Sequence, residues 1–185
     1  MVKYAIIGVE GPHDQAFVSK VLRKFLKFET FTGEKENLDK FWHKFIPKYP
    51  KKGNLYKRLD MPSILFTDNI SVAVYAGEGS NLVTNLDDIL GNNPQYQSDI
   101  AAFGIIADAD KKTPETVVED YYNCFVKYFP NFPKSLGVPD ENMPRTGIYI
   151  LPNNSDTGVL DTLLCQCGEV VYPEYMERAK SYLDM

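Results

Sequence analysis

Short apolar runs alternate along this chain with segments of helical periodicity, and this alternation constrains the fold more than any other feature. Strand-like runs rich in apolar and β-branched residues occupy 3–9, 63–67, 71–75, 101–107 and 147–151. Apolar residues three or four apart predict helices from Pro12 to about 25, and over 82–90, 114–129, 158–167 and 174–183. This order predicts a three-layer α/β fold with a mostly parallel sheet, right-handed crossovers and an antiparallel edge strand.

The length of 185 residues suits a single domain spanning 1–185. We expect an insertion at about 29–70, between the first helix and the second core strand. Within it, Asp39–Ile46 is predicted as a short helix. Pro94–Asp99 is predicted as a loop before the strand that ends near Ala107.

Cysteine usage and hydropathy indicate a cytoplasmic protein. The chain begins directly in a strand pattern, and no apolar run approaches the ~18–20 residues that a membrane span needs. Three cysteines without secretory features favour reduced thiols. We expect Cys165 and Cys167 to be buried on a helix rather than to bind metal, because no second cysteine pair accompanies them.

Two acids follow the apolar run 101–107 one residue apart, at Asp108 and Asp110. The carboxyl ends of parallel strands are where sites form, and residues i and i+2 of an extended backbone point the same way. Two carboxylates so close repel each other unless a cation lies between them, and oxygen ligands suit Mg²⁺, Mn²⁺ or Ca²⁺. The alternative is that both acids are solvated loop residues or helix N-caps.

The net charge of −5 is unevenly distributed. Segment 20–58 holds twelve Lys/Arg and four Asp/Glu, so the remainder carries −13. Basic groups interleaved with aromatics can track a phosphate backbone and stack on bases, which makes nucleic acid a candidate partner of this segment. We expect most of the aromatics to pack inward instead, and the lysines are left open between solvent and a polyanion. The aromatics are Phe25, Phe28, Phe31, Phe41, Trp42, Phe45, Tyr49 and Tyr56.

Two motifs occur in a recognisable order. Residues 10–14 have the form E-G-x-x-D after the first strand, and residues 108–110 have the form D-x-D after the third core strand, with Gly77-Glu78-Gly79 between them. This combination resembles the toprim domain, the metal-binding catalytic fold of topoisomerases, bacterial primases and the overcoming-lysogenization-defect (OLD) nucleases. The stretch 151–164 is similar to small uncharacterised toprim-like proteins related to the OLD nucleases.

The resemblance implies a Rossmann-like toprim topology for the sheet, and it implies roles for the acids. Glu10 corresponds to a glutamate that acts as general acid/base or metal ligand, and Asp108 and Asp110 correspond to the acids that coordinate Mg²⁺ or Mn²⁺; these three are the candidate catalytic residues. Asp14 and Asp161 would complete the ligand set, although relatives usually carry glutamate at the place of Asp161. Five further residues are candidates for binding phosphate: Gly11, Gly77, Gly79, Lys111 and Lys112. Asp156 lies close to Asp161 in sequence and could substitute for it.

The resemblance therefore implies a Mg²⁺- or Mn²⁺-dependent phosphodiester hydrolase, a nuclease acting on DNA or RNA, since two such ions can activate water and neutralise the transferring phosphoryl group. The alternative is a non-catalytic toprim-like subunit that binds metal or nucleic acid and works with a separate partner such as an ATPase, because no ATPase segment accompanies the motifs. A phosphatase of the haloacid-dehalogenase type is disfavoured, since Lys112 stands where that family has Thr or Val.

Overall fold

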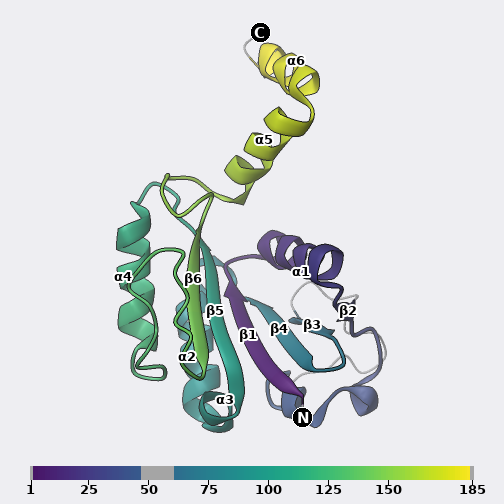
Figure 1. Cartoon of the computed structure of the whole chain (residues 1–185), viewed down its shortest axis with the longest axis vertical. Helices are drawn as coiled ribbons and strands as arrows, with labels where there is room; N and C mark the ends of the chain where they lie inside the picture. The colour runs from purple at the N-terminus through teal and green to yellow at the C-terminus, as the bar shows by residue number, and fades with distance from the viewer. Residues whose placement is uncertain (1, 47–60, 184–185) are drawn as a thin grey trace.

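The computed structural model describes residues 2–46 and 61–183 and contains one six-stranded sheet of order β2-β3-β4-β1-β5-β6 (Figure 1). The strands are β1 (Lys3–Val9), β2 (Glu29–Thr30), β3 (Ser63–Phe66), β4 (Ile70–Ala76), β5 (Ile100–Asp108) and β6 (Arg145–Leu151). Neighbours among β4, β1, β5 and β6 pair in parallel, whereas β3 runs antiparallel to both β2 and β4. The predicted mostly parallel sheet with an antiparallel edge is confirmed.

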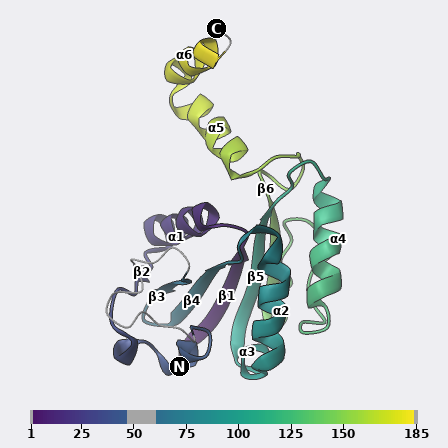
Figure 2. The same ribbon diagram turned by 180° about the vertical axis from the view of Figure 1, so that it is seen from behind.

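Helices cover both faces of this sheet, so the fold has three layers (Figures 1 and 2). We call the two sides the α1 face and the α2–α4 face. The helices are α1 (Pro12–Leu26), α2 (Leu82–Asn92), α3 (Gln95–Ser98), α4 (Pro114–Phe125), α5 (Leu160–Val171) and α6 (Pro173–Leu183). Single 3-10 turns occur at Lys35–Asn37, Lys40–His43 and Gly79–Asn81.

Side-chain alternation along each strand divides the core into two parts. On the α2–α4 face, Ile6, Phe103 and Ile105 pack with residues of α2 and α4 such as Leu86 and Phe125. The α1 face holds a smaller cluster in which strand residues including Val9, Val72 and Val74 contact Val18 of α1. The unequal size of the two clusters follows from topology. Crossovers β4–α2–β5 and β5–α4–β6 run in one direction along the sheet, whereas the chain leaving β1 runs in the other, and right-handed crossovers then place α1 opposite α2 and α4.

The last two helices leave the sheet. Residues 160–183, which we call the C-terminal arm, project from the carboxyl end of β6 away from the sheet (Figures 1 and 2). Within the arm only Leu160 is buried, and α6 packs against α5 through contacts that include Met176 near Gly168. Across residues 2–46 and 61–183, no helix combines the length and apolar character that a membrane crossing requires.

Two predictions of local secondary structure were wrong. The predicted helix Asp39–Ile46 is reduced to the 3-10 turn Lys40–His43, because Trp42 is anchored by its indole N–H to the Ser71 hydroxyl at 2.8 Å. The predicted loop at 94–99 contains the single turn of α3, whose Tyr96 is buried and donates to the Phe41 carbonyl at 2.9 Å. In both cases tertiary contacts of a large aromatic side chain decide the local backbone.

Burial predictions succeeded for part of the aromatic set. Trp42 and Phe45 are buried in the core, as expected. Phe25 at the end of α1 is 77% exposed, so the buried face of this helix ends about one turn before the predicted one. Tyr49 and Tyr56 lie outside the described residues. Cys165 and Cys167 lie on α5 but are exposed, which corrects the prediction that they are buried; the reason is that α5 belongs to the projecting arm.

Candidate metal and catalytic site

The first two candidate residues lie at the carboxyl ends of neighbouring parallel strands. Asp108 is the last residue of β5, and Glu10 directly follows β1. The register Val9 to Ile106 holds these strand ends at the same edge of the sheet. This is the edge at which α/β proteins bind ligands, because loops and helix starts converge there.

The turn after β4 closes against the end of β1. Gly77 donates its N–H to the Val9 carbonyl at 2.9 Å, and Gly79 donates to the Glu10 carbonyl at 2.7 Å. A Cβ added at Gly77 would lie 2.2 Å from the Leu82 Cα, so only glycine permits α2 to begin this close to the turn. The turn therefore fixes the backbone of Glu10.

Asp14 lies in the first turn of α1 and is 8% exposed. Its carboxylate accepts the Gly11 N–H at 2.8 Å, which satisfies a backbone donor that the start of the helix would otherwise leave unpaired. Burial nevertheless raises the pKa of Asp14, against the opposing effect of that hydrogen bond, and the charge of Asp161 adds to the rise. The E-G-x-x-D motif thus includes one capping carboxylate that faces other acids.

The start of α5 is tied to the end of β5. Leu160 donates its N–H to Asp108 Oδ1 at 3.0 Å, and the Asp110 N–H donates to the Gly158 carbonyl at 2.8 Å. Asp110 is exposed and adopts φ 53°, the left-handed region in which aspartate is tolerated better than most residues. These contacts bring Asp161, the second residue of α5, close enough for its charge to raise the pKa of both Asp14 and Asp108.

The electrostatics of the site are those of crowded acids. Burial raises the pKa of Glu10 to about 7, and the charges of Asp108, Asp110 and Asp14 add to this rise. Burial likewise raises the pKa of Asp108 to about 6, with contributions from Asp14, Asp110 and Asp161. The five predicted acids therefore form one interacting group, which we call the carboxylate cluster: Glu10, Asp14, Asp108, Asp110 and Asp161.

Sequence reasoning missed one member of this site. The hydroxyl of Tyr121 on α4 donates to Glu10 Oε1 at 3.2 Å, and the ring is 7% exposed. Burial and then the Glu10 charge raise the pKa of Tyr121, so its hydroxyl stays a donor. Helical periodicity marks Tyr121 as a core residue, and no sequence signal connects it with a glutamate 111 positions earlier.

The donor chemistry of the cluster suits Mg²⁺ or Mn²⁺, because every candidate ligand is a carboxylate oxygen. The geometry is less complete. Among residues 2–46 and 61–183, no three His, Cys, Asp or Glu side chains are arranged closely enough to hold a metal ion as they stand. The charges of the acids raise one another's pKa values, but in the described part of the chain their carboxylates do not converge on one point. Binding of an ion would therefore require side-chain rotation.

The predicted phosphate-binding glycines have their N–H groups engaged within the chain. Gly77 and Gly79 donate to the end of β1, and Gly11 donates to Asp14. These three N–H groups are therefore not available to a phosphate in this conformation, and the phosphate-binding role of the glycines stays a prediction. Lys111 and Lys112 are both exposed beside the site, and Lys112 forms an ion pair with Asp120 at 2.9 Å.

Asp156 is hydrogen-bonded within the turn between β6 and α5. It accepts a hydrogen bond from the Asn153 side chain at 2.8 Å, and its own N–H donates to Asn153 Oδ1 at 2.9 Å. These bonds close the turn between β6 and α5. Nothing in this arrangement supports the expectation that Asp156 substitutes for Asp161, which is itself near Asp14 and Asp108.

The basic segment 20–58 is described only in part, because residues 47–60 lie outside the described residues. Its first part lies on α1, where Lys20, Arg23 and Lys24 are exposed, and Lys27 caps the helix with φ 61°. Nucleic acid as a partner of this segment stays a prediction. The helix α1 begins at Pro12, next to Glu10, and carries its basic residues towards its other end.

Fold and site together define a three-layer α/β protein with an acidic cluster at the carboxyl edge of its sheet. The chain belongs to the DUF3226 family, described as a protein family of unknown function, whose sequence profile matches residues 4–185. A comparison with curated proteins finds no match. Among solved structures, the chain is similar to the crystal structure of the hypothetical protein PH0156 from Pyrococcus horikoshii OT3, with a TM-score of 0.55 and 14% identity over 98% of this chain and 73% of that one. This likeness concerns the fold alone.

Proposed function

We propose that the protein is a toprim-like phosphodiester hydrolase that uses Mg²⁺ or Mn²⁺ to cleave DNA or RNA. The observation that carries this proposal is the placement of Glu10 and Asp108, two acids with raised pKa values, at the carboxyl ends of adjacent parallel strands. Strongly perturbed acids that cluster at such an edge are typical of functional sites. A structural role would be served better by neutral side chains, since mutual repulsion of buried carboxylates destabilises the fold.

The residues divide into three roles under this proposal. Asp108 and Asp110 would hold the ion, with Asp14 and Asp161 as further carboxylates. When bound, such an ion polarises the phosphoryl group and lowers the pKa of a bound water. Glu10, with a pKa of about 7, is suited to take up and release a proton near neutral pH, which is the property of a general acid/base. Tyr121 orients Glu10 by donating to Oε1.

The proposal is tested by cleavage of labelled single-stranded DNA, double-stranded DNA and RNA with Mn²⁺ or Mg²⁺. The variant Glu10→Gln is expected to lose activity by roughly 10²-fold or more, the low end of what a general acid/base contributes. Asp108→Asn, which removes a ligand of the ion, is expected to abolish metal-dependent cleavage. Asp156→Asn is the matched control, because this carboxylate lies near α5 but is bound within its own turn. Absence of metal-dependent cleavage, or cleavage that survives Asp108→Asn, would contradict the proposal.

A second candidate function is a non-catalytic subunit that binds metal or nucleic acid beside a separate partner such as an ATPase. One observation favours the absence of catalysis: in the described part of the chain, the acids do not converge into a preformed ligand set that would position an ion for cleavage. Under this alternative Mn²⁺ binds and stabilises the protein, Asp108→Asn abolishes the binding, and no nucleic acid is cut. The three free cysteines suit a reducing compartment, so we place either activity in the cytoplasm.

A further inference from the structure

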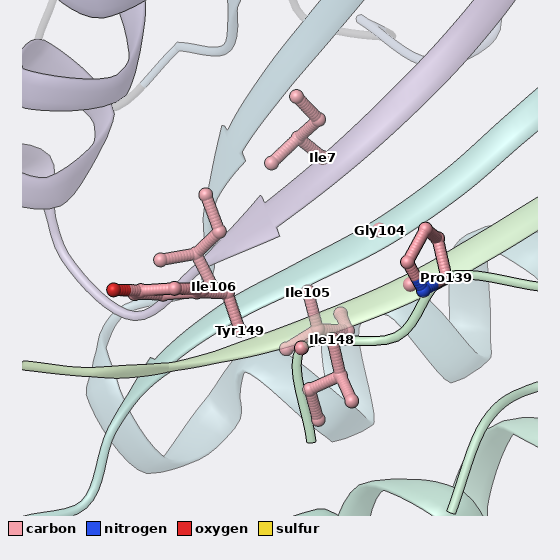
Figure 3. A pocket seen from close by; sticks show the side chains of 9 residues that line it. Ile7, Gly104, Ile105, Ile106, Pro139, Ile148 and Tyr149 are labelled. Carbon is pink, nitrogen blue, oxygen red and sulfur yellow. The ribbon is translucent and has the colours of Figure 1, made fainter. Parts of the chain in front are cut away.

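On the α1 face, β5 and β6 carry a row of side chains that leads directly to the carboxylate cluster. Asp108 and Ile106 lie two residues apart on β5, so their side chains project on the same face of the sheet. Tyr149 of β6 is the register partner of Ile106, and paired residues share a face. Figure 3 shows Ile106 and Tyr149 together on this side, whereas Ile105 and Ile148 point to the opposite, helix-covered side. The row thus runs from an acid to an aliphatic and aromatic pair.

A hollow of about 260 Å³ lies beside this pair, and the described residues that line it are apolar, glycine or Tyr149 (Figure 3). We call it the sheet hollow. Its floor contains Gly104 and Gly147, which pair in register on β5 and β6, and Ile7 and Pro139 are among its other lining residues. A Cβ at Gly104 would meet its nearest neighbour, the Gly147 carbonyl, at an ordinary 3.7 Å. Packing within the chain therefore does not require glycine here, and such strand glycines mark places where another group approaches the backbone.

The ring of Tyr149 is held in place and remains accessible. Its hydroxyl donates to the Pro152 carbonyl at 3.1 Å, and the residue is 38% exposed. Ile106 beside it, together with Ile7, packs against the cluster of the α1 face, so this side of the sheet hollow is fixed as well. A fixed and partly exposed aromatic ring offers a stacking surface that needs little further ordering when a planar ligand binds.

The size and position of the sheet hollow suit one planar ring system attached to a phosphate. Its volume is that of a sphere roughly 8 Å across, narrower than the about 10–12 Å diameter of a helix with its side chains. Two residues of a strand rise roughly 6.6 Å and neighbouring strands lie about 4.8 Å apart, so the backbone of Tyr149 lies roughly 8 Å from that of Asp108. The sugar of a nucleotide spans a gap of this kind between its phosphate and its base.

Two cations lie at the opposite, amino-terminal end of the same face. Ala102 of β5 pairs with Arg145 of β6 and with Ala5 of β1. Lys3 precedes Ala5 by two residues, and Lys3 and Arg145 line a second hollow of about 410 Å³. Arg145 forms an ion pair with Glu141 at 2.8 Å, but both side chains are largely exposed, and a pair of this kind contributes little stability. A phosphate can therefore compete for Arg145, so this end of the face suits an anionic backbone.

We propose that one unpaired nucleobase of a nucleic-acid strand occupies the sheet hollow, stacked on Tyr149, while its phosphate lies at the carboxylate cluster and the strand continues along β5 towards Lys3 and Arg145. This inference rests on the proposed function and narrows its substrate to single strands or to nucleotides that leave a duplex. A paired base must unpair and unstack before it reaches the sheet hollow. Because the hydroxyl of Tyr149 is already bonded to Pro152, recognition is by stacking, which accepts every base.

Photo-crosslinking tests the position of the base without requiring cleavage. Single-stranded oligonucleotides that carry one iododeoxyuridine, a base that crosslinks to aromatic rings on which it stacks, are irradiated with the full chain in the presence of Ca²⁺ or Mn²⁺. The crosslinked peptide is expected to contain Tyr149. Tyr149→Ala should weaken binding of these oligonucleotides roughly tenfold, whereas Tyr149→Phe, which keeps the ring, should bind like the wild type. Tyr172→Ala is the matched control, because this tyrosine is 61% exposed but lies at the end of α5.

A comparison of substrates tests the same inference through cleavage. A single strand should be cleaved faster than the duplex of the same sequence by roughly tenfold or more, because the duplex must first release a base. Gly104→Val places a side chain in the sheet hollow, where its Cβ has room, and leaves every acid unchanged. This variant is expected to cleave single strands roughly tenfold more slowly, the loss of one stacked base.

The outcomes separate this inference from the proposed function. Cleavage combined with crosslinks away from Tyr149, with equal rates on single strand and duplex, or with a wild-type rate for Gly104→Val would overturn the inference and leave the nuclease proposal standing. Crosslinks to Tyr149 without any cleavage would support the inference and favour the non-catalytic subunit that binds nucleic acid. Absence of both binding and cleavage would overturn the inference together with the proposed function.

Discussion

At the scale of single residues, the carboxylate cluster makes the fold sensitive to pH. The pKa of Glu10 is about 7 in the folded protein against 4.5 ordinarily, and that of Asp108 is about 6 against 3.8. As the pH rises from about 4 to 7, the unfolded chain releases these protons first, so the folded state binds more protons and its stability falls. Asp87 and Asp140, whose pKa values are lowered, have the opposite effect, but only below about pH 4.

We therefore predict that the midpoint of thermal unfolding, measured with chelator present, decreases between pH 5 and pH 8. Glu10→Gln should flatten this decrease, because its neutral side chain carries no charge to repel Asp108. Asp156→Asn should retain the wild-type slope. Mn²⁺ at pH 7.5 should restore the midpoint by several degrees, since a ligand at ~100 times its dissociation constant contributes about 2.7 kcal/mol. A midpoint that is constant or rises over this range would contradict the electrostatic account.

Tyr121 offers a second prediction at this scale. Its hydrogen bond stabilises the charged form of Glu10 and so lowers the glutamate pKa against the effect of burial. Tyr121→Phe should raise the pKa of Glu10 above about 7, measured by the ¹³C shift of its carboxyl in NMR spectra. Loss of one hydrogen bond should also cost about 0.5–1.5 kcal/mol of stability. Tyr122→Phe, on the neighbouring position of α4, is the control, and an equal pKa change in both variants would refute the role of Tyr121.

At the scale of elements, the turn between β4 and α2 leaves no room for a side chain at Gly77. A Cβ at Gly77 would clash with the backbone of Leu82, which is 1% exposed and begins α2. Gly77→Ala is expected to destabilise the protein by about 1–3 kcal/mol, which lowers the unfolding midpoint by roughly 2–4 °C per kcal/mol. Gly11→Ala is the matched control, since its Cβ would meet the nearest atom at 3.4 Å and its φ of −136° suits any residue. Equal midpoints for the two variants would show that α2 adapts freely.

The elements also explain which features the sequence predicts. Strand ends are visible as apolar runs that stop, so Glu10 and Asp108 could be found and placed at one edge. Long-range contacts leave no such mark: Tyr121 has the spacing of a core residue of α4, and Trp42 turns a predicted helix into a 3-10 turn through Ser71. Amphipathic periodicity predicted that α5 buries one face, and hence that Cys165 and Cys167 are buried. Periodicity does not indicate which surface that face packs against. Both cysteines are exposed because α5 belongs to the arm that projects from the sheet.

At the scale of the whole molecule, the distribution of charge matters more than its sum. The net charge of −5 opposes binding of nucleic acid, yet α1 presents Lys20, Arg23 and Lys24 to solvent along a helix that starts beside Glu10. A local basic surface can steer a polyanion towards an acidic site once cations neutralise that site. The carboxylate cluster and α1 would then act on the same ligand, one on the scissile phosphate and the other on its neighbours.

This arrangement predicts a specific dependence on salt. Each phosphate of duplex DNA that a protein neutralises steepens the fall of log affinity against log salt by about 0.9. Replacement of Lys20, Arg23 and Lys24 by Gln should therefore weaken binding of a 20-mer duplex, measured by fluorescence anisotropy between 50 and 200 mM salt, and reduce the slope by roughly 2–3. The double control Lys127→Gln and Lys180→Gln removes cations that are paired with Asp87 and Glu169 and should leave the slope near its wild-type value. If the α1 variant keeps the wild-type slope, the basic face of this helix does not contact the backbone of nucleic acid, and the charge asymmetry of the chain serves another purpose.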